Sequence, residues 1–182
     1  MLDACVLYPL PLRDTLLRAA QRNMCAVRWS RRILDEVARN LVKDRRATPE
    51  QARNLIDVME RAFEDAEVPE AAIASLEPRM LNEPADRHVL AAAVVSDAHA
   101  IVTSNLRHFS ATACAPFGIE VVHPDAFLCG LHERAPAKIR GVLAEQAAAL
   151  SRPRLTVPEV LDRLAATVPE FVSQVRDAAK RN

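Results

Sequence analysis

The sequence is poor in glycine, and this absence excludes the common phosphate-binding motifs. Its 182 residues include only three glycines, Gly118, Gly130 and Gly141. The dinucleotide fingerprint and the P-loop both need closely spaced glycines, because their backbone must approach a phosphate group. Neither motif is present. The length suffices for one well-buried domain with an appendage rather than for two independent domains.

The sequence also lacks net charge, since 24 basic and 24 acidic residues balance. A uniformly basic nucleic-acid-binding protein is therefore not expected. The balance conceals an uneven distribution. Residues 1–62 carry twelve basic and eight acidic side chains, residues 63–133 carry three and eleven, and residues 134–182 carry nine and five. The acidic charge is concentrated in the middle of the chain, a distribution that solvated helix faces also produce.

The four cysteines form no C-x-x-C pair, and no Cys/His spacing indicates zinc. Their apolar neighbours predict buried free thiols in a reducing compartment. No apolar run approaches the roughly 18 residues that a membrane span needs. The N-terminus also lacks the basic start and long apolar stretch of a signal peptide. We therefore expect a cytoplasmic protein without a membrane partner.

Short apolar runs alternate with helical patterns over the first two thirds of the chain. The apolar runs predict buried strands over residues 1–8, 100–103 and 119–122. Helical spacing predicts helices over residues 11–21, from Ser30 past Leu41, from Thr48 to about Asp65, and from Asp86 onward, with a less regular acidic stretch before Asp86. This alternation indicates an α/β fold with a mostly parallel sheet covered on both faces.

No strand pattern returns beyond Pro124. Prolines delimit four predicted helices, over residues 124–134, 136–151, 156–167 and 169–181. Thr156 and Glu159 have the spacing of a capping box at the start of the third. The sequence therefore predicts a helical appendage.

Asp3 lies inside an apolar strand pattern, where a charge is costly unless it is paired or bound to a metal. The strand is short before Asp3, which predicts a trimmed or misassigned N-terminus. Ligands gather at the carboxyl ends of parallel strands, where we expect Asp3, Glu36, Asp86 and the Thr103-Ser104-Asn105 turn. Carboxylates from distant parts of a chain repel one another, so such a cluster requires a divalent cation, and oxygen ligands indicate Mg²⁺ or Mn²⁺.

Four sequence blocks follow one another in order. They are Leu2-Asp3-Ala4-Cys5-Val6-Leu7, Ser30 through Ile33-Leu34-Asp35-Glu36, Asp86-Arg87-His88-Val89-Leu90-Ala91-Ala92, and Ile101 through Thr103-Ser104-Asn105-Leu106-Arg107-His108-Phe109. Together they resemble the PIN-domain ribonucleases, and among them the VapC-type toxins of toxin–antitoxin modules. The resemblance spans roughly residues 1–127, which we predict to be a PIN-like nuclease domain. Residues 128–182 are the predicted helical C-terminal extension, and the tail from His123 onward resembles the extension of one PIN subgroup.

The resemblance implies a three-layer α/β/α ribonuclease that cuts RNA with metal-activated water. Asp3, Glu36 and Asp86 would hold Mg²⁺ or Mn²⁺, while Thr103 and Asn105 would orient a carboxylate, a metal-bound water or the phosphate. Asn105 is thus included with the catalytic residues, and His108 is a further candidate for contacting phosphate. Many members carry a fourth acid where this sequence has Asn105 and His108, so three carboxylates suffice for one metal and the number of metals, one or two, stays open.

These residues also have ordinary structural interpretations. Asp86 could cap a helix, Asn105 could stabilise a turn, and Glu36 competes with its neighbour Asp35. His108 could be an exposed turn histidine.

The resemblance also implies partners: RNA, with structured RNA such as tRNA as the expected substrate, a cognate antitoxin protein, and a second copy in a homodimer. The basic segments on either side of the acidic middle could hold the phosphate backbone. Two alternatives stay open. One is a catalytically weak PIN module that binds RNA or a protein, and the other is a housekeeping RNA-processing nuclease.

Overall fold

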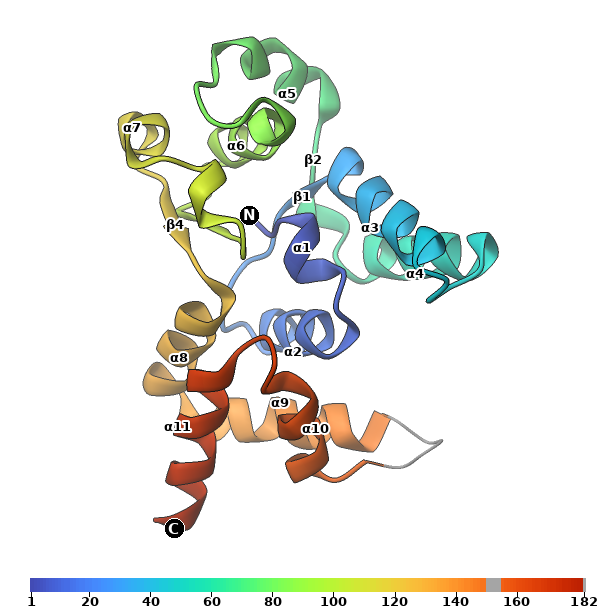
Figure 1. The fold of residues 1–182 in the computed structure, drawn as a ribbon, viewed down its shortest axis with the longest axis vertical. Helices are drawn as coiled ribbons and strands as arrows, with labels where there is room; N and C mark the ends of the chain where they lie inside the picture. Colours follow the sequence, from blue (N-terminus) through green and yellow to red (C-terminus); the bar gives the residue numbers. More distant parts are fainter. Residues whose placement is uncertain (150–154, 182) are drawn as a thin grey trace. The chain divides into compact units, whose positions relative to one another are not determined.

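The computed structural model describes residues 1–149 and 155–181, which fold as two compact units. The first unit comprises Met1–Tyr8 and Val27–Val122, and the second comprises Pro9–Ala26 with the described residues from His123 onward. Figure 1 shows the helices and strands as a ribbon coloured along the sequence from the N-terminus to the C-terminus. Within the described residues, no helix combines the length and apolar character that crossing a membrane requires.

Short parallel strands run through the first unit. β1 (Trp29–Ser30) pairs in parallel with β2 (Glu67–Val68), and β3 (Ala100–Val102) pairs in parallel with β4 (Glu120–Val122). The predicted strands near residues 100 and 119 and their parallel pairing are confirmed. β2 was not predicted, because it contributes two residues only and lies in the acidic stretch expected to be irregular.

The first residues of the chain join the two strand pairs. Leu2 forms a parallel bridge with Val102, and its N–H donates to the Arg28 carbonyl oxygen at 2.9 Å. The N–H of Asp3 donates to the Val102 carbonyl oxygen at 3.1 Å. The N-terminal segment therefore lies between β3 and the residue preceding β1, and Asp3 lies at the carboxyl end of β3.

The predicted strand over residues 1–8 is correct only as far as Asp3. Helix α1 (Ala4–Leu7) begins directly afterwards, because the Asp3 carboxylate accepts a hydrogen bond from the Ala4 N–H and caps the helix. The apolar run after Asp3 is thus a buried helical turn. Its apolar residues do not alternate with polar ones, so the pattern could not distinguish the two forms.

The first unit contains five further helices, two of which begin where the sequence predicted, after Ser30 and after Thr48. They are α3 (Arg31–Lys43), α4 (Pro49–Ala62), α5 (Glu70–Leu76), α6 (Arg87–Val95) and α7 (Ala111–Cys114), with single 3-10 turns at Glu64–Ala66, Glu77–Arg79, Pro84–Asp86, Leu106–His108 and Ala115–Phe117. Ser30 caps α3, and Thr48 forms a capping box with Gln51. The predicted irregular stretch contains α5, a short helix between proline-bearing turns.

The second unit is helical throughout its described residues. Its helices are α2 (Leu10–Gln21), α8 (Pro124–Arg134), α9 (Pro136–Ala149), α10 (Val157–Leu164) and α11 (Pro169–Lys180). The four predicted C-terminal helices are confirmed, except that the predicted end of the second at residue 151 lies outside the described residues. α2 packs against α9 and α10, and α8 against α11. The predicted domain boundary after residue 127 stays a prediction. The structure shows in addition that α2, from the N-terminal part of the chain, packs with the C-terminal helices.

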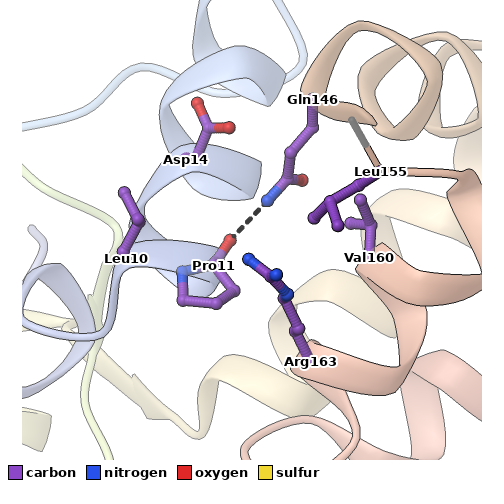
Figure 2. A pocket seen from close by; sticks show the side chains of 7 residues that line it. All are labelled: Leu10, Pro11, Asp14, Gln146, Leu155, Val160 and Arg163. Atoms are coloured by element: carbon purple, nitrogen blue, oxygen red, sulfur yellow. Dashed lines mark hydrogen bonds between the residues drawn. The ribbon is translucent and has the colours of Figure 1, made fainter. Parts of the chain in front are cut away.

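A small cavity of about 30 Å³ lies between α2, α9 and α10 in this unit (Figure 2). Gln146 points into it, and its amide N–H donates to the Pro11 carbonyl oxygen at 2.9 Å. The buried Thr15 hydroxyl donates to the amide oxygen of Gln146 at 2.8 Å. The cavity has room for about one water molecule, so this polar contact fixes the packing of α2 and α9 rather than forming a ligand site.

Candidate active site

Asp3 is a buried carboxylate, 4% exposed, held by hydrogen bonds to both of its oxygens. One oxygen accepts the Ala4 N–H at 2.6 Å, and the other accepts the Thr103 hydroxyl at 2.6 Å. Both distances are short, as is typical of bonds to an ionised carboxylate. The sequence prediction that this acid needs partners is met by donors from α1 and from the residue that follows β3.

Thr103 and Asn105 connect the end of β3 to this carboxylate. Thr103 is fully buried, and its N–H donates to the Val122 carbonyl oxygen at 3.1 Å, which fixes it to β4. Its hydroxyl accepts the Asn105 N–H at 3.0 Å while donating to Asp3. Asn105 therefore contributes its backbone to the cluster. Thr103 orients the carboxylate, one of the roles expected from the sequence.

Glu36 lies on α3, half-buried, and the structure brings it into the electrostatic field of the other two acids. Burial raises the pKa of the Glu36 carboxyl, and the negative charges of Asp3 and Asp86 raise this pKa further, whereas Arg39 lowers it. Of the three predicted metal ligands, Glu36 is thus close enough to both Asp3 and Asp86 to be repelled by each of them.

Asp86 occupies the N-cap position of α6, but its side chain makes no capping hydrogen bond there. Its carboxylate instead lies 2.6 Å from Nδ1 of His108, which donates the hydrogen bond. The Asp86 side chain is 16% exposed and that of His108 is 28% exposed. Helix capping does not explain this acid. His108, predicted as a phosphate contact, is placed to orient Asp86.

Cys5 also belongs to the cluster, and sequence reasoning missed it. Its thiol donates to Asp3 at 3.2 Å, lies 3.3 Å from the Thr103 hydroxyl, and accepts the Ser104 N–H at 3.2 Å. Burial and the charge of Asp3 raise the pKa of the Cys5 thiol to about 11, so it is protonated at neutral pH. The one sequence feature that could have indicated this role is the position of Cys5 two residues after Asp3. A strand would place both side chains on the same face, and the helical turn that Asp3 caps also brings them into contact.

Asp3, Glu36 and Asp86 offer carboxylate oxygens, the type of ligand that Mg²⁺ and Mn²⁺ take. In the parts of the chain that the structure describes, no group of three His, Cys, Asp or Glu side chains is arranged so that it could hold a metal ion directly. Mg²⁺ usually keeps several waters and takes one or two carboxylates directly. Here Asp3 is fixed by hydrogen bonds, and Glu36 lies in the field of both Asp3 and Asp86.

Comparisons with known proteins match both parts of the chain. The PIN domain family matches residues 1–107, and the family described as the VapC50 C-terminal domain matches residues 124–177. A curated protein of Mycobacterium tuberculosis (strain ATCC 25618 / H37Rv), "Putative ribonuclease VapC50", is 39% identical over 97 residues. These residues are 53% of this chain and 57% of that protein, so the match spans little more than half of the relative. No solved structure matches.

Proposed function

Because the chain belongs to the PIN-domain family, we propose that it is a metal-dependent endoribonuclease that hydrolyses RNA phosphodiester bonds and acts as the toxin of a VapC-type toxin–antitoxin pair. The observation that carries this proposal is the electrostatic coupling of Glu36 to Asp3 and Asp86. A fold gains no stability from gathering three like charges, so the cluster has to be explained by what binds there.

Asp3, Glu36 and Asp86 would hold Mg²⁺ or Mn²⁺, which when bound lowers the pKa of a water and offsets charge on the phosphate. The other residues position these ligands. The Thr103 hydroxyl fixes one oxygen of Asp3, and His108 fixes one oxygen of Asp86. Each acid keeps acceptor capacity for a cation or its waters.

The family and the named relative support further parts of the proposal. We infer a three-layer α/β/α arrangement around the parallel strands, RNA such as tRNA as substrate, an antitoxin that covers the carboxylate cluster, and a homodimer. A cytoplasmic location agrees with the four free cysteines.

A second candidate function is a catalytically weak PIN module that binds RNA or a protein partner. It is favoured by one observation: Asn105 and His108 stand where many family members carry a fourth acid. A direct measurement of RNA cleavage decides between an active ribonuclease and a catalytically weak binding module. A housekeeping RNA-processing nuclease would also cleave, and a small open reading frame directly upstream would favour the toxin instead.

The test is RNA cleavage by the full chain with Mn²⁺ or Mg²⁺, with and without EDTA. We expect cleavage that EDTA abolishes and that Asp3→Asn and Asp86→Asn each reduce at least about 100-fold, since each removes a metal ligand. Asp97→Asn, an exposed acid outside the cluster, is the matched control and should retain activity. Cleavage that persists in both ligand variants would show that the metal-site proposal is wrong.

A further inference from the structure

Four cations gather at the C-terminal end of α3 without ion-pair partners among the described residues. They are Arg39, Lys43, Arg45 and Arg46, all of them exposed. Two other arginines of α3 are neutralised by ion pairs: Arg31 binds Asp35 and Glu60, and Arg32 binds Glu70 and Glu77. The contrast leaves a local positive surface on a chain with no net charge.

One of these cations lies over an aromatic ring. The guanidinium carbon of Arg46 is 5.5 Å from the ring centroid of Tyr8, the only tyrosine in the chain. The Tyr8 hydroxyl donates to Asp44 at 2.6 Å, so the ring is anchored to the end of α3. The nearest acid, Asp44, is thereby engaged with Tyr8 rather than with the cations.

Arg45 occupies a backbone conformation that favours glycine. Its φ is 56°, in the left-handed region, directly after the C-cap residue Asp44. Glycine is the usual residue at this position of a helix end, and any other residue there is less favourable. An arginine at this strained position adds charge to the surface and no packing, since it is exposed.

This surface continues from the carboxylate cluster. α1 packs against α3, with Asp3 beginning α1 and Tyr8 ending it. Glu36 precedes Asp44 by eight residues on α3, which corresponds to about 12 Å along a helix. The three acids thus lie toward one end of the α1–α3 pair, and Tyr8 with Lys43, Arg45 and Arg46 lies at the other. Arg39 stands between them, close enough to lower the pKa of Glu36.

We propose that Tyr8, Arg39, Lys43, Arg45 and Arg46 form a basic ledge that binds the single-stranded RNA segment adjoining the bond to be cut. Unpaired cations that follow a backbone, combined with an aromatic side chain on which a base stacks, are the combination typical of single-strand binding. Stacking requires an unstacked base, which a loop or an end provides and a duplex does not. The substrate feature read here is therefore an unpaired nucleotide, and this inference rests on the proposed ribonuclease function.

The test uses the full chain with Asp86→Asn, so that RNA is bound in Mg²⁺ without being cut. Binding of a short fluorescein-labelled single-stranded RNA is measured by anisotropy over a range of salt concentrations. The triple variant K43A/R45A/R46A should bind at least about 10-fold more weakly, and its log–log salt slope should be smaller by about 2, since each lost phosphate contact removes about 0.7 from that slope. Tyr8→Ala should weaken binding at least about 5-fold with the slope unchanged, and Tyr8→Phe should not.

The matched control is R53A/R61A/R79A, which removes three exposed arginines of the same unit that are not part of the ledge. Fluorescence of the buried Trp29 shows that each variant is folded. Equal RNA binding by the ledge triple, Tyr8→Ala and the control triple overturns the proposal. So does a ledge triple that keeps its RNA affinity but loses binding to poly-glutamate, since the surface then serves an acidic protein partner.

The outcomes also separate the ledge from the nuclease proposal. Ledge-dependent RNA binding without cleavage in any metal supports the ledge and refutes the nuclease. Metal-dependent cleavage by the wild-type chain, together with ledge-independent binding, does the reverse.

Discussion

Replacing Thr103 by valine removes one hydroxyl from the carboxylate cluster and leaves the shape of the side chain nearly unchanged. That hydroxyl donates to Asp3 at 2.6 Å and accepts the Asn105 N–H at 3.0 Å. Thr103 is fully buried and Asp3 is 4% exposed, so water cannot replace the lost donor without rearrangement. Among the described residues, the Cys5 thiol, a weaker donor at 3.2 Å, is the one other side chain that reaches the same oxygen.

The magnitude follows from these contacts. A hydrogen bond to a charged group contributes about 1.5–3 kcal/mol, and the half-exposed Asn105 N–H loses roughly 0.5–1 kcal/mol because it can turn to water. We therefore expect Thr103→Val to lower the free energy of unfolding of the first unit by about 2–4 kcal/mol. RNA cleavage should fall as well, since the carboxylate loses its fixed orientation.

Urea unfolding followed by Trp29 fluorescence measures this change. Trp29 is the only tryptophan, is fully buried and lies on β1, so its emission reports the first unit alone. Thr112→Val is the control, because Thr112 is exposed and its hydroxyl bonds to the exposed Ser110 hydroxyl, so a loss below about 0.5 kcal/mol is expected. If Thr103→Val changes the free energy no more than this control does, the bond to a charged Asp3 does not exist and the reasoning about the cluster fails.

Three further predictions address the cluster, the histidines and a turn. Glu36→Gln should raise the metal-free unfolding free energy by roughly 0.5–1 kcal/mol, by removing like-charge repulsion, and should reduce the stabilisation that Mg²⁺ gives; a less stable metal-free variant in urea would contradict this. Burial lowers the pKa of His88 and of His132, so the folded protein binds these protons less readily than the unfolded chain. Stability should therefore fall as the pH drops below about 6.5, by up to about 1.4 kcal/mol per pH unit for each histidine, and replacing both by Gln should flatten the urea midpoint between pH 7 and pH 5. Gly118→Ala should destabilise the first unit by about 1–2 kcal/mol, because the φ of 65° at Gly118 is unfavourable for alanine and the added methyl group would meet no atom to pack against. The control is Gly130→Ala, inside a helix with no close neighbours, which should be neutral or stabilising in thermal unfolding followed by circular dichroism.

The acids of the site could be predicted because their local patterns are unusual. Asp3 interrupts an apolar run, whereas Asp86 precedes an apolar helix that it could have capped, and the family-like block around it favoured a site role. Their mutual approach depends on strand pairing over long distances in the chain, which only the resemblance to a family supplied. The helical extension was predictable from its prolines and caps, since these act within a few residues.

The partners of these acids could not be predicted, for reasons of geometry. Cys5 reaches Asp3 only because the chain turns into a helix at Ala4, where the pattern indicated a strand. His108 lies 22 residues after Asp86 in the chain and contacts it from a 3-10 turn. A single turn has no repeating hydrophobic pattern, so the sequence does not indicate where its side chains point. Two-residue strands such as β2 are also too short to produce an alternating pattern.

The second unit is assembled from two stretches of chain, and this has a consequence for folding during synthesis. α2 leaves the ribosome early, but Gln146, which accepts a hydrogen bond from the buried Thr15 hydroxyl of α2, is synthesised 131 residues later. At the usual 5–20 residues per second, α2 waits roughly 6–26 s for that partner. During this interval its apolar face, with Leu12 and Leu16, is exposed to chaperones, proteases and other nascent chains. The first unit can complete its parallel strands before α9 exists, so the order of synthesis favours a nuclease unit that is folded before its helical companion.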